Sequence, residues 1–385
     1  MNENSNEAIE EELNSEGRAS GVEREPDGSD EHPEITDPFD PKDIDIKTKN
    51  PSMDSLIKRL DHDEIDLNPD FQRKGGIWSK RGKSRLIESL LLNIPLPVFY
   101  VASDADGNWI VVDGLQRLTA LNQFIRERAF ALEGLEFLKQ FNGQKFGDLP
   151  RPMQRRILES EPVFHIIQAS SSKAVTQTIF KRINTGGMPL SAQEIRHALY
   201  QGPVTKLLKE LAAGEAFLRA TGGSMKDDRM ADRECVLRYL AFSIRGIDAY
   251  DKPDLDKFLS DTMEQLNEKD EQSFVGYRAG FERAMERAFQ IFGGLGFRRQ
   301  RRGWSGKSPI NKALFEAWSV ALGGLDDEQA ERLIGRKEAV NEAFINLLES
   351  DRDFVTAISN RIWNVTGVKT RFSRIHKLIA HVLET

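Results

Sequence analysis

A junction between a short strand and a helix constrains the fold more than any other feature of this sequence. Residues 109–112 form an apolar run that ends at Asp113 and Gly114, and leucine or isoleucine then recurs at helical spacing as far as Ile125. Glycine tolerates the backbone angles of a sharp break, so we expect a strand that turns at Gly114 directly into a helix. The junction therefore predicts a domain that contains both strands and helices.

The segments around this junction complete a small α+β domain. The apolar run 97–102 precedes the turn-rich loop 104–108, which predicts a hairpin with the strand 109–112. Helical periodicity marks most of the flanking sequence. The expected helices follow Ser52, run from Ser79 to Asn93 and cover 150–160 and 175–183, with one further strand at 163–167.

The second half of the chain is expected to be all-helical. Ser191 and Glu194 have the spacing of a capping box, which marks a helix start. From about residue 203 onward the apolar residues keep helical spacing, and no strand pair stands out. We therefore predict a small-sheet domain over 46–205 and an all-helical domain over 206–385.

The charge is unevenly distributed. Residues 1–40 hold fourteen acidic residues against two basic ones, so the net charge of −7 becomes +5 over the remainder. Few large apolar residues occur there, and we expect 1–45 to be a disordered acidic tail. It is either a solubilising leader or an acidic mimic that competes with DNA for a basic surface.

Composition also bears on the compartment. The sequence has one cysteine, which excludes an intrachain disulfide framework, and its first residues lack the pattern of a secretory signal. No apolar stretch reaches the length of a membrane span. We expect a cytoplasmic protein without a membrane partner.

The strand-to-helix junction is also the best candidate for chemistry. A helix start exposes unpaired backbone N–H groups and carries partial positive charge, so it attracts anions. Gly114 lets the backbone approach a phosphate, and Arg117 can grip it with a planar fork. Asp113 can orient Arg117 or a metal-bound water. Asp-Gly turns and surface arginines are common, however, so the pattern by itself also fits an ordinary turn.

Several motifs in a fixed order resemble the N-terminal domain of GmrSD-type restriction systems, in the ParB/sulfiredoxin-like superfamily. The resemblance covers about residues 50–205. The motifs are LNPDFQR at 67–73, Trp78, IPLP at 94–97, DGLQRLTAL at 113–121, FKRINTGG at 180–187 and LSAQEI at 190–195.

The resemblance implies a domain that binds a nucleoside triphosphate (NTP) with Mg²⁺, sometimes hydrolyses it, and controls action on DNA. The catalytic candidates that it implies are Asp113, Gln116 and Arg117. The residues that it implies for the nucleotide are Asn68, Gln72, Arg73, Gly114, Thr119, Arg182, Asn184 and Glu194. The family usually has Gln where Leu115 stands, so hydrolysis is less secure than binding.

Some of these residues have ordinary structural explanations that remain open. Gln72 and Arg73 can close a surface ion pair, Glu194 is already explained by the capping box, and Asn184 can simply end a helix. No histidine pattern indicates a metal site, so protein ligands for a metal stay unknown.

The best nucleic-acid candidate is the basic segment 287–315, which contains seven basic residues and no acidic one. We expect its cations to contact the DNA backbone. The residues concerned are Arg298, Arg299, Arg301, Arg302, Lys307 and Lys312. The alternatives are a solvated loop or a docking surface for the acidic tail.

The leading hypothesis is an NTP-binding regulator or sensor in DNA-directed, restriction-type or anti-phage defence, possessing at most nucleoside triphosphatase activity. The His-Asn-His nuclease that such systems carry elsewhere is not recognisable after residue 205, so nuclease activity of this chain alone is not expected. The alternative is a non-enzymatic DNA-binding or adaptor module that recruits a separate nuclease subunit.

Overall fold

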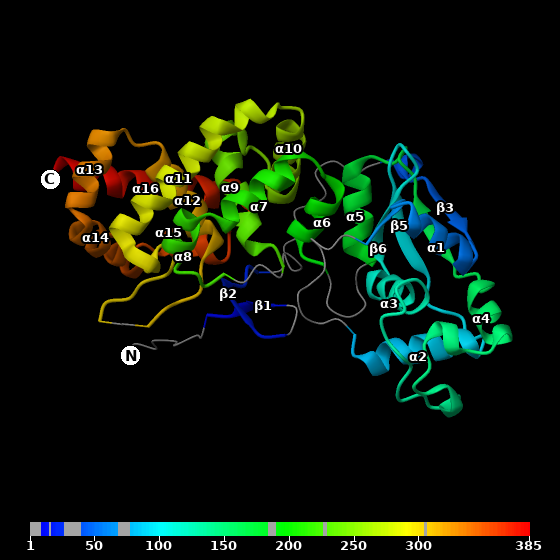
Figure 1. Ribbon diagram of the computed structural model, residues 1–385. Helices are drawn as coiled ribbons and strands as arrows, with labels where there is room; N and C mark the ends of the chain where they lie inside the picture. Colours follow the sequence, from blue (N-terminus) through cyan, green and yellow to red (C-terminus); the bar gives the residue numbers. More distant parts are fainter. Residues whose placement is uncertain are drawn as a thin grey trace. The chain divides into compact units, whose positions relative to one another are not determined.

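The computed structural model describes residues 9–14, 17–26, 40–67, 78–183, 190–225, 229–303 and 306–385. The chain divides into two compact units. Residues Pro38–Leu190 form the sheet unit, and Met1–Asp37 together with Ser191–Thr385 form the helical unit. Figure 1 shows the elements of both.

A five-stranded mixed sheet organises the sheet unit, with strand order β3-β7-β5-β6-β4. β5 pairs antiparallel with β6 and parallel with β7, β3 is antiparallel to β7, and β4 is parallel to β6. The strands are β3 (Ile46–Lys49), β4 (Ile65–Asp66), β5 (Phe99–Ser103), β6 (Trp109–Asp113) and β7 (Phe164–Ile167).

Helices pack around this sheet because each buries one apolar stripe. Ser52 and Ser79 cap the first two through their hydroxyl groups, as the sequence predicts. The helices are α1 (Met53–Asp61), α2 (Lys80–Leu91), α3 (Leu115–Ile125), α4 (Arg151–Leu158) and α5 (Lys173–Ile183). Short 3-10 helices lie at Pro41–Asp43, Lys139–Phe141 and Phe146–Asp148. The shared core includes the stacked rings of Phe99 and Phe164, whose centroids are 4.8 Å apart.

The helical unit is built from eleven α-helices in the described residues. They are α6 (Ala192–Leu199), α7 (Pro203–Ala213), α8 (Glu215–Thr221), α9 (Ala231–Arg245), α10 (Leu255–Asn267), α11 (Phe274–Phe292), α12 (Lys312–Gly323), α13 (Asp327–Gly335), α14 (Lys337–Ser350), α15 (Arg352–Ser359) and α16 (Val365–Glu384). Further 3-10 helices lie at Ile247–Ala249, Glu271–Ser273 and Gly293–Leu295.

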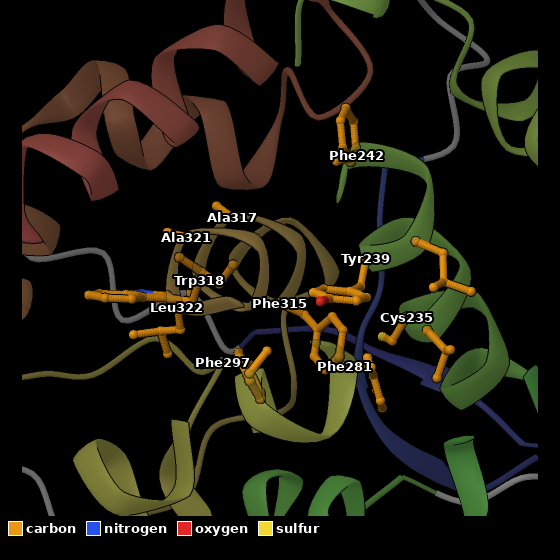
Figure 2. Packing of buried hydrophobic residues seen from close by; sticks show 14 of the residues in the cluster. Cys235, Tyr239, Phe242, Phe281, Phe297, Phe315, Ala317, Trp318, Ala321 and Leu322 are labelled. Atoms are coloured by element: carbon orange, nitrogen blue, oxygen red, sulfur yellow. The ribbon is translucent and has the colours of Figure 1, made fainter. Parts of the chain in front are cut away.

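The core of the helical unit is rich in aromatic side chains. Figure 2 shows Tyr239 beside Phe281, with ring centroids 5.1 Å apart, and Phe297 against Phe315 at 4.5 Å. Trp318 on α12 is fully buried in the same cluster. This core is separate from the one around the sheet, so each unit has its own hydrophobic centre.

The structure confirms the α+β fold class and the helical second half. The hairpin at 97–112, the helix after Gly114 and the capping box at Ser191 are all present. The edge strands β3 and β4 had no clear pattern in the sequence, because they are short and one of them is fully exposed. The units divide between Leu190 and Ser191, so α6 lies in the helical unit and not before a boundary at 205.

The acidic N-terminal residues differ from the expected disorder. Within the described residues of this segment, β1 (Glu11–Leu13) and β2 (Ala19–Glu23) form an antiparallel pair. The pair continues into the helical unit, because Val22 bridges Ile310 in parallel. The acidic composition of this segment suggested disorder. Composition alone cannot show that carboxylates of the segment pair with cations that lie far away in the sequence.

None of the helices in the described ranges combines the length and the apolar character that crossing a membrane requires.

Candidate functional site

The start of α3 has the geometry that the sequence predicts for an anion site. Gly114 is the N-cap at φ 101°, in the left-handed region that favours glycine, and no side chain in the described part of the chain caps the helix. A Cβ at Gly114 would lie 2.4 Å from Cδ1 of Phe99, so only glycine fits there. The helix start combines unpaired N–H groups with the positive end of the helix dipole.

Arg117 differs from the expected exposed phosphate ligand. Its side chain is 10% exposed, and the guanidinium lies over the ring of Phe99, 4.3 Å from the ring centroid. It donates hydrogen bonds to the carbonyl oxygen of Pro97, to that of Val98 at 3.2 Å and to Oδ2 of Asp113 at 2.9 Å.

These contacts make Arg117 a connector between α3 and the start of β5. Burial lowers the pKa of Arg117, and the charge of Asp113 opposes that shift. The sequence suggested that Arg117 reaches out to a phosphate, but its side chain turns inward because its donors match carbonyl groups that lie nineteen and twenty residues earlier in the sequence. Asp113 orients Arg117, as expected.

Two other candidates at this junction remain available. Gln116 is half-buried in the first turn of α3. Thr119 is 8% exposed, and its hydroxyl oxygen has no hydrogen-bond partner among the described residues. Buried hydroxyl groups are nearly always paired, so Thr119 has a donor and an acceptor to offer.

The remaining nucleotide candidates are not gathered in one described site. Asn68, Gln72, Arg73 and Asn184 lie outside the described residues. Arg182 is exposed in the last turn of α5.

Glu194 belongs to the helical unit and is 1% exposed. Its Oε2 accepts the N–H of Ser191 at 2.5 Å and lies 3.6 Å from Arg229. The capping box thus accounts for the position of the Glu194 side chain.

The basic segment is largely engaged within the helical unit. Arg298 is 3% exposed and donates to the carbonyl oxygens of Ser308 and Thr221 and to the hydroxyl of Ser224. Burial lowers the pKa of Arg298 to about 10. Arg299 pairs with Glu23, and Lys312 pairs with Glu12 at 2.7 Å.

The exposed cations of this segment are Arg301, Arg302 and Lys307. Arg302 pairs with Glu342 at 2.7 Å, and Lys307 donates to the carbonyl oxygen of Gly222 at 3.2 Å. Of the two alternatives to DNA contact, the structure favours the docking surface for the acidic N-terminal residues.

A buried network of charges in the helical unit was missed from the sequence. Glu234 and Arg238 on α9 pair at 2.7 Å, Arg238 also lies 3.5 Å from Glu316, and Glu316 pairs with Arg371. The spacing Glu234 to Arg238 was a signal, since an i,i+4 ion pair inside an apolar helix is unusual. Across the described ranges, no cluster of His, Cys, Asp and Glu is arranged to hold a metal ion.

The sheet unit is thus a small mixed-sheet domain in which a strand passes through a left-handed glycine into an uncapped helix. Residues 55–201 match the family model described as the GmrSD restriction endonuclease N-terminal domain. The match covers less than half of the chain, and no C-terminal nuclease domain is recognised. No curated protein matches the chain.

Proposed function

We propose that this protein is a component of a restriction-type defence system and that its sheet unit binds an NTP, with Mg²⁺ carried by the phosphates. The family of residues 55–201 supports the first part. The observation that carries the second is the start of α3 at Gly114, where no side chain of the described residues caps the backbone N–H groups.

In this proposal the backbone binds the phosphates, and Arg117 shapes the turn instead of gripping the ligand. Gln116 and Thr119 contribute polar groups from the first two turns of α3, and the exposed Arg182 adds positive charge. A nucleotide-bound Mg²⁺ takes its six ligands from phosphate oxygens, several waters and at most one or two protein oxygens, so the site does not require a cluster of carboxylates. Whether the NTP is hydrolysed is a separate property of the same site.

A second candidate is an adaptor that recruits a separate nuclease without using a nucleotide. The engagement of Arg117 by two carbonyl groups and Asp113 favours it, because these contacts occupy the donors that would reach a phosphate. DNA remains the proposed target of the system in both cases. Contact with DNA would involve Arg301, Arg302 or Lys307, since Arg298 and Lys312 are buried and Arg299 is half-buried and paired with Glu23.

A thermal-shift screen of all four NTPs, with and without Mg²⁺, distinguishes the two candidates. A ligand at about one hundred times its Kd stabilises the folded state by about 2.7 kcal/mol. We expect one NTP to raise the Tm of the sheet unit. Absence of a shift with every NTP would leave the adaptor.

Substitutions then locate the site. Gln116→Ala and Arg182→Ala should each weaken NTP binding by about tenfold, because each variant loses one hydrogen bond to the ligand, neutral for Gln116 and charge-assisted for Arg182. Arg155→Ala is the matched control, since Arg155 is an exposed arginine of the same unit with only a surface ion pair to Glu159. Equal losses in all three variants would argue against a site at α3.

A further inference from the structure

The described N-terminal segment, residues 9–14 and 17–26, occupies the helical unit much as a bound peptide would. Its backbone extends the structure at Ile310: the N–H of Glu23 donates to the carbonyl oxygen of Ile310, and the N–H of Ile310 donates to that of Gly21, both at 2.8 Å. Addition of a strand in this way is a common mode of peptide recognition.

Carboxylates of this segment meet cations that the helical unit presents. Glu25 accepts two hydrogen bonds from Arg238, at 2.7 and 2.6 Å. Glu23 accepts from Arg299 and Glu12 from Lys312. Paired donors on a carboxylate are the strongest form of this interaction and fix its position.

The segment contributes little apolar surface. Val22 is its only buried apolar side chain among the described residues, whereas Leu13 is 52% exposed. Its attachment therefore depends on ion pairs and backbone hydrogen bonds. Competing carboxylates weaken such ion pairs, whereas salt weakens them less than it weakens exposed pairs, because these pairs are partly buried. A segment held in this way is easier to exchange than one held by a hydrophobic core.

The helical unit has a surplus of positive charge beneath the segment. Arg238 and Lys312 share Glu234, and Arg238 also lies near Glu316. Among the described residues, Arg299 forms its ion pair with Glu23 of the segment. Removal of Glu12, Glu23 and Glu25 would leave these cations in need of other acidic partners.

The surface also selects for backbone shape. Gly21 has a φ of +83°, and a Cβ there would lie 2.2 Å from the carbonyl oxygen of Ser224. A ligand must therefore approach as an extended chain with glycine at this point. This requirement favours a polypeptide over the phosphate backbone of a nucleic acid.

We propose that the surface of the helical unit formed by Ile310, Arg238, Arg299 and Lys312 is a binding site for an extended acidic peptide that contains a glycine. In this chain its own residues 9–14 and 17–26 fill the site, and a partner's acidic strand takes their place when they leave. The site lies in a different unit from α3, so this proposal does not rest on nucleotide binding.

The first experiment displaces the segment from its binding surface in the full-length chain. The triple variant Glu12→Lys, Glu23→Lys and Glu25→Lys places like charges opposite the three cations. A fluorescent peptide of residues 9–26 should bind this variant at least about tenfold more tightly than the wild type, whose tethered segment competes at roughly millimolar effective concentration. The peptide with Gly21→Val should not bind.

A control variant, Glu10→Lys, reverses the charge of an exposed carboxylate of the same segment that does not contact the three cations in the described residues. Glu10 pairs with Arg24 of the same segment. This variant should behave as the wild type does. The proposal would be overturned if the folded Glu12→Lys, Glu23→Lys and Glu25→Lys variant did not bind the peptide, or if it bound duplex DNA instead.

A second experiment covers the case in which the test variant fails to fold. A protease site inserted between residues 26 and 40 of the otherwise unchanged chain allows the segment to be cut after folding. We expect the fragment to stay bound at low salt, to leave at about 0.5 M salt and to rebind on desalting. Retention up to the unfolding transition, or unfolding of the helices when it leaves, would show a fixed structural element.

Discussion

At the scale of single residues, Arg117 shows how a phosphate-type motif can serve the fold. Its guanidinium connects α3 to the carbonyl groups that precede β5 and stacks on Phe99. The residue is therefore a positioning residue for the turn that carries Gly114. Its removal tests structure before it tests ligand binding.

We predict that Arg117→Ala lowers the free energy of unfolding by about 2 to 4 kcal/mol, because two carbonyl groups and a carboxylate lose their donor. Urea denaturation of the sheet unit measures this loss. The control is Arg126→Ala on the same helix, where an exposed pair with Asp61 should contribute less than about 1 kcal/mol. Full stability of Arg117→Ala combined with loss of NTP binding would restore its role as a phosphate ligand.

Glu88 provides a pH-dependent prediction. Its carboxylate accepts the N–H groups of Glu136, Phe137 and Leu138 at 2.8 to 3.0 Å. Burial alone would raise the pKa of Glu88, but these hydrogen bonds outweigh it and the pKa lies below its ordinary value of 4.5. A lowered pKa in the folded state means that the carboxylate stabilises the fold above that ordinary value.

The wild type should therefore exceed Glu88→Gln in unfolding free energy by about 1 to 3 kcal/mol at pH 7. The difference should shrink as the pH falls from about 5.5 through the ordinary carboxyl range, since Glu88 then gains a proton on unfolding. Denaturation midpoints of both proteins between pH 7 and 3 measure it. A constant difference across this range would mean that the charge of Glu88 has no part in the stabilisation.

At the scale of elements, the join between β6 and α3 depends on one glycine. Gly107 at the other end of the same strand has a similar left-handed backbone, with φ +85°, but no atom lies within 4 Å of a Cβ there. The two positions differ in packing and not in backbone strain. They form a natural pair for substitution.

We predict that Gly114→Ala destabilises the sheet unit by at least about 2 kcal/mol more than Gly107→Ala does. Both variants incur the strain of a left-handed alanine, roughly 1 kcal/mol, but only Gly114→Ala forces Phe99 to move. Thermal or urea unfolding of the two variants gives the comparison. Equal losses would show that the ring of Phe99 moves aside freely.

At the scale of the whole molecule, the chain has two cores that differ in how they use charge. In the helical unit, the side chains of the ion pair Arg371–Glu316 are both completely buried. Burial raises the pKa of Glu316, and the charge of Arg371 partly opposes that shift. Removal of one partner from such a pair leaves an uncompensated buried charge.

Arg371→Met should destabilise the helical unit by about 3 to 5 kcal/mol and leave the sheet unit unchanged. Hydrogen exchange measured by mass spectrometry should show lost protection in α12 and α16 but not in α3. Lys369→Met is the control on the same helix, because Lys369 and its partner Asp248 are both exposed. Equal loss of protection in both units would show that they unfold together.

Local sequence determined much of this protein. The hairpin, the break at Gly114, the serine caps and the helical second half depend on residues a few positions apart, whose backbone preferences and periodicity can be read directly. The motifs at 113–121 and 190–195 also pointed to the family whose model matches residues 55–201.

Only the tertiary structure decided what the charged side chains do. Arg117 turned inward because carbonyl groups twenty residues earlier lie beside it, and the acidic N-terminal residues form strands because Arg238, Arg299 and Lys312 hold them. Those ion pairs join residues more than two hundred positions apart, with the whole sheet unit between them in the sequence. A charged side chain must either contact water or have a partner of opposite charge or a hydrogen-bonding group. The sequence shows this requirement, and the fold alone determines which partner lies within reach.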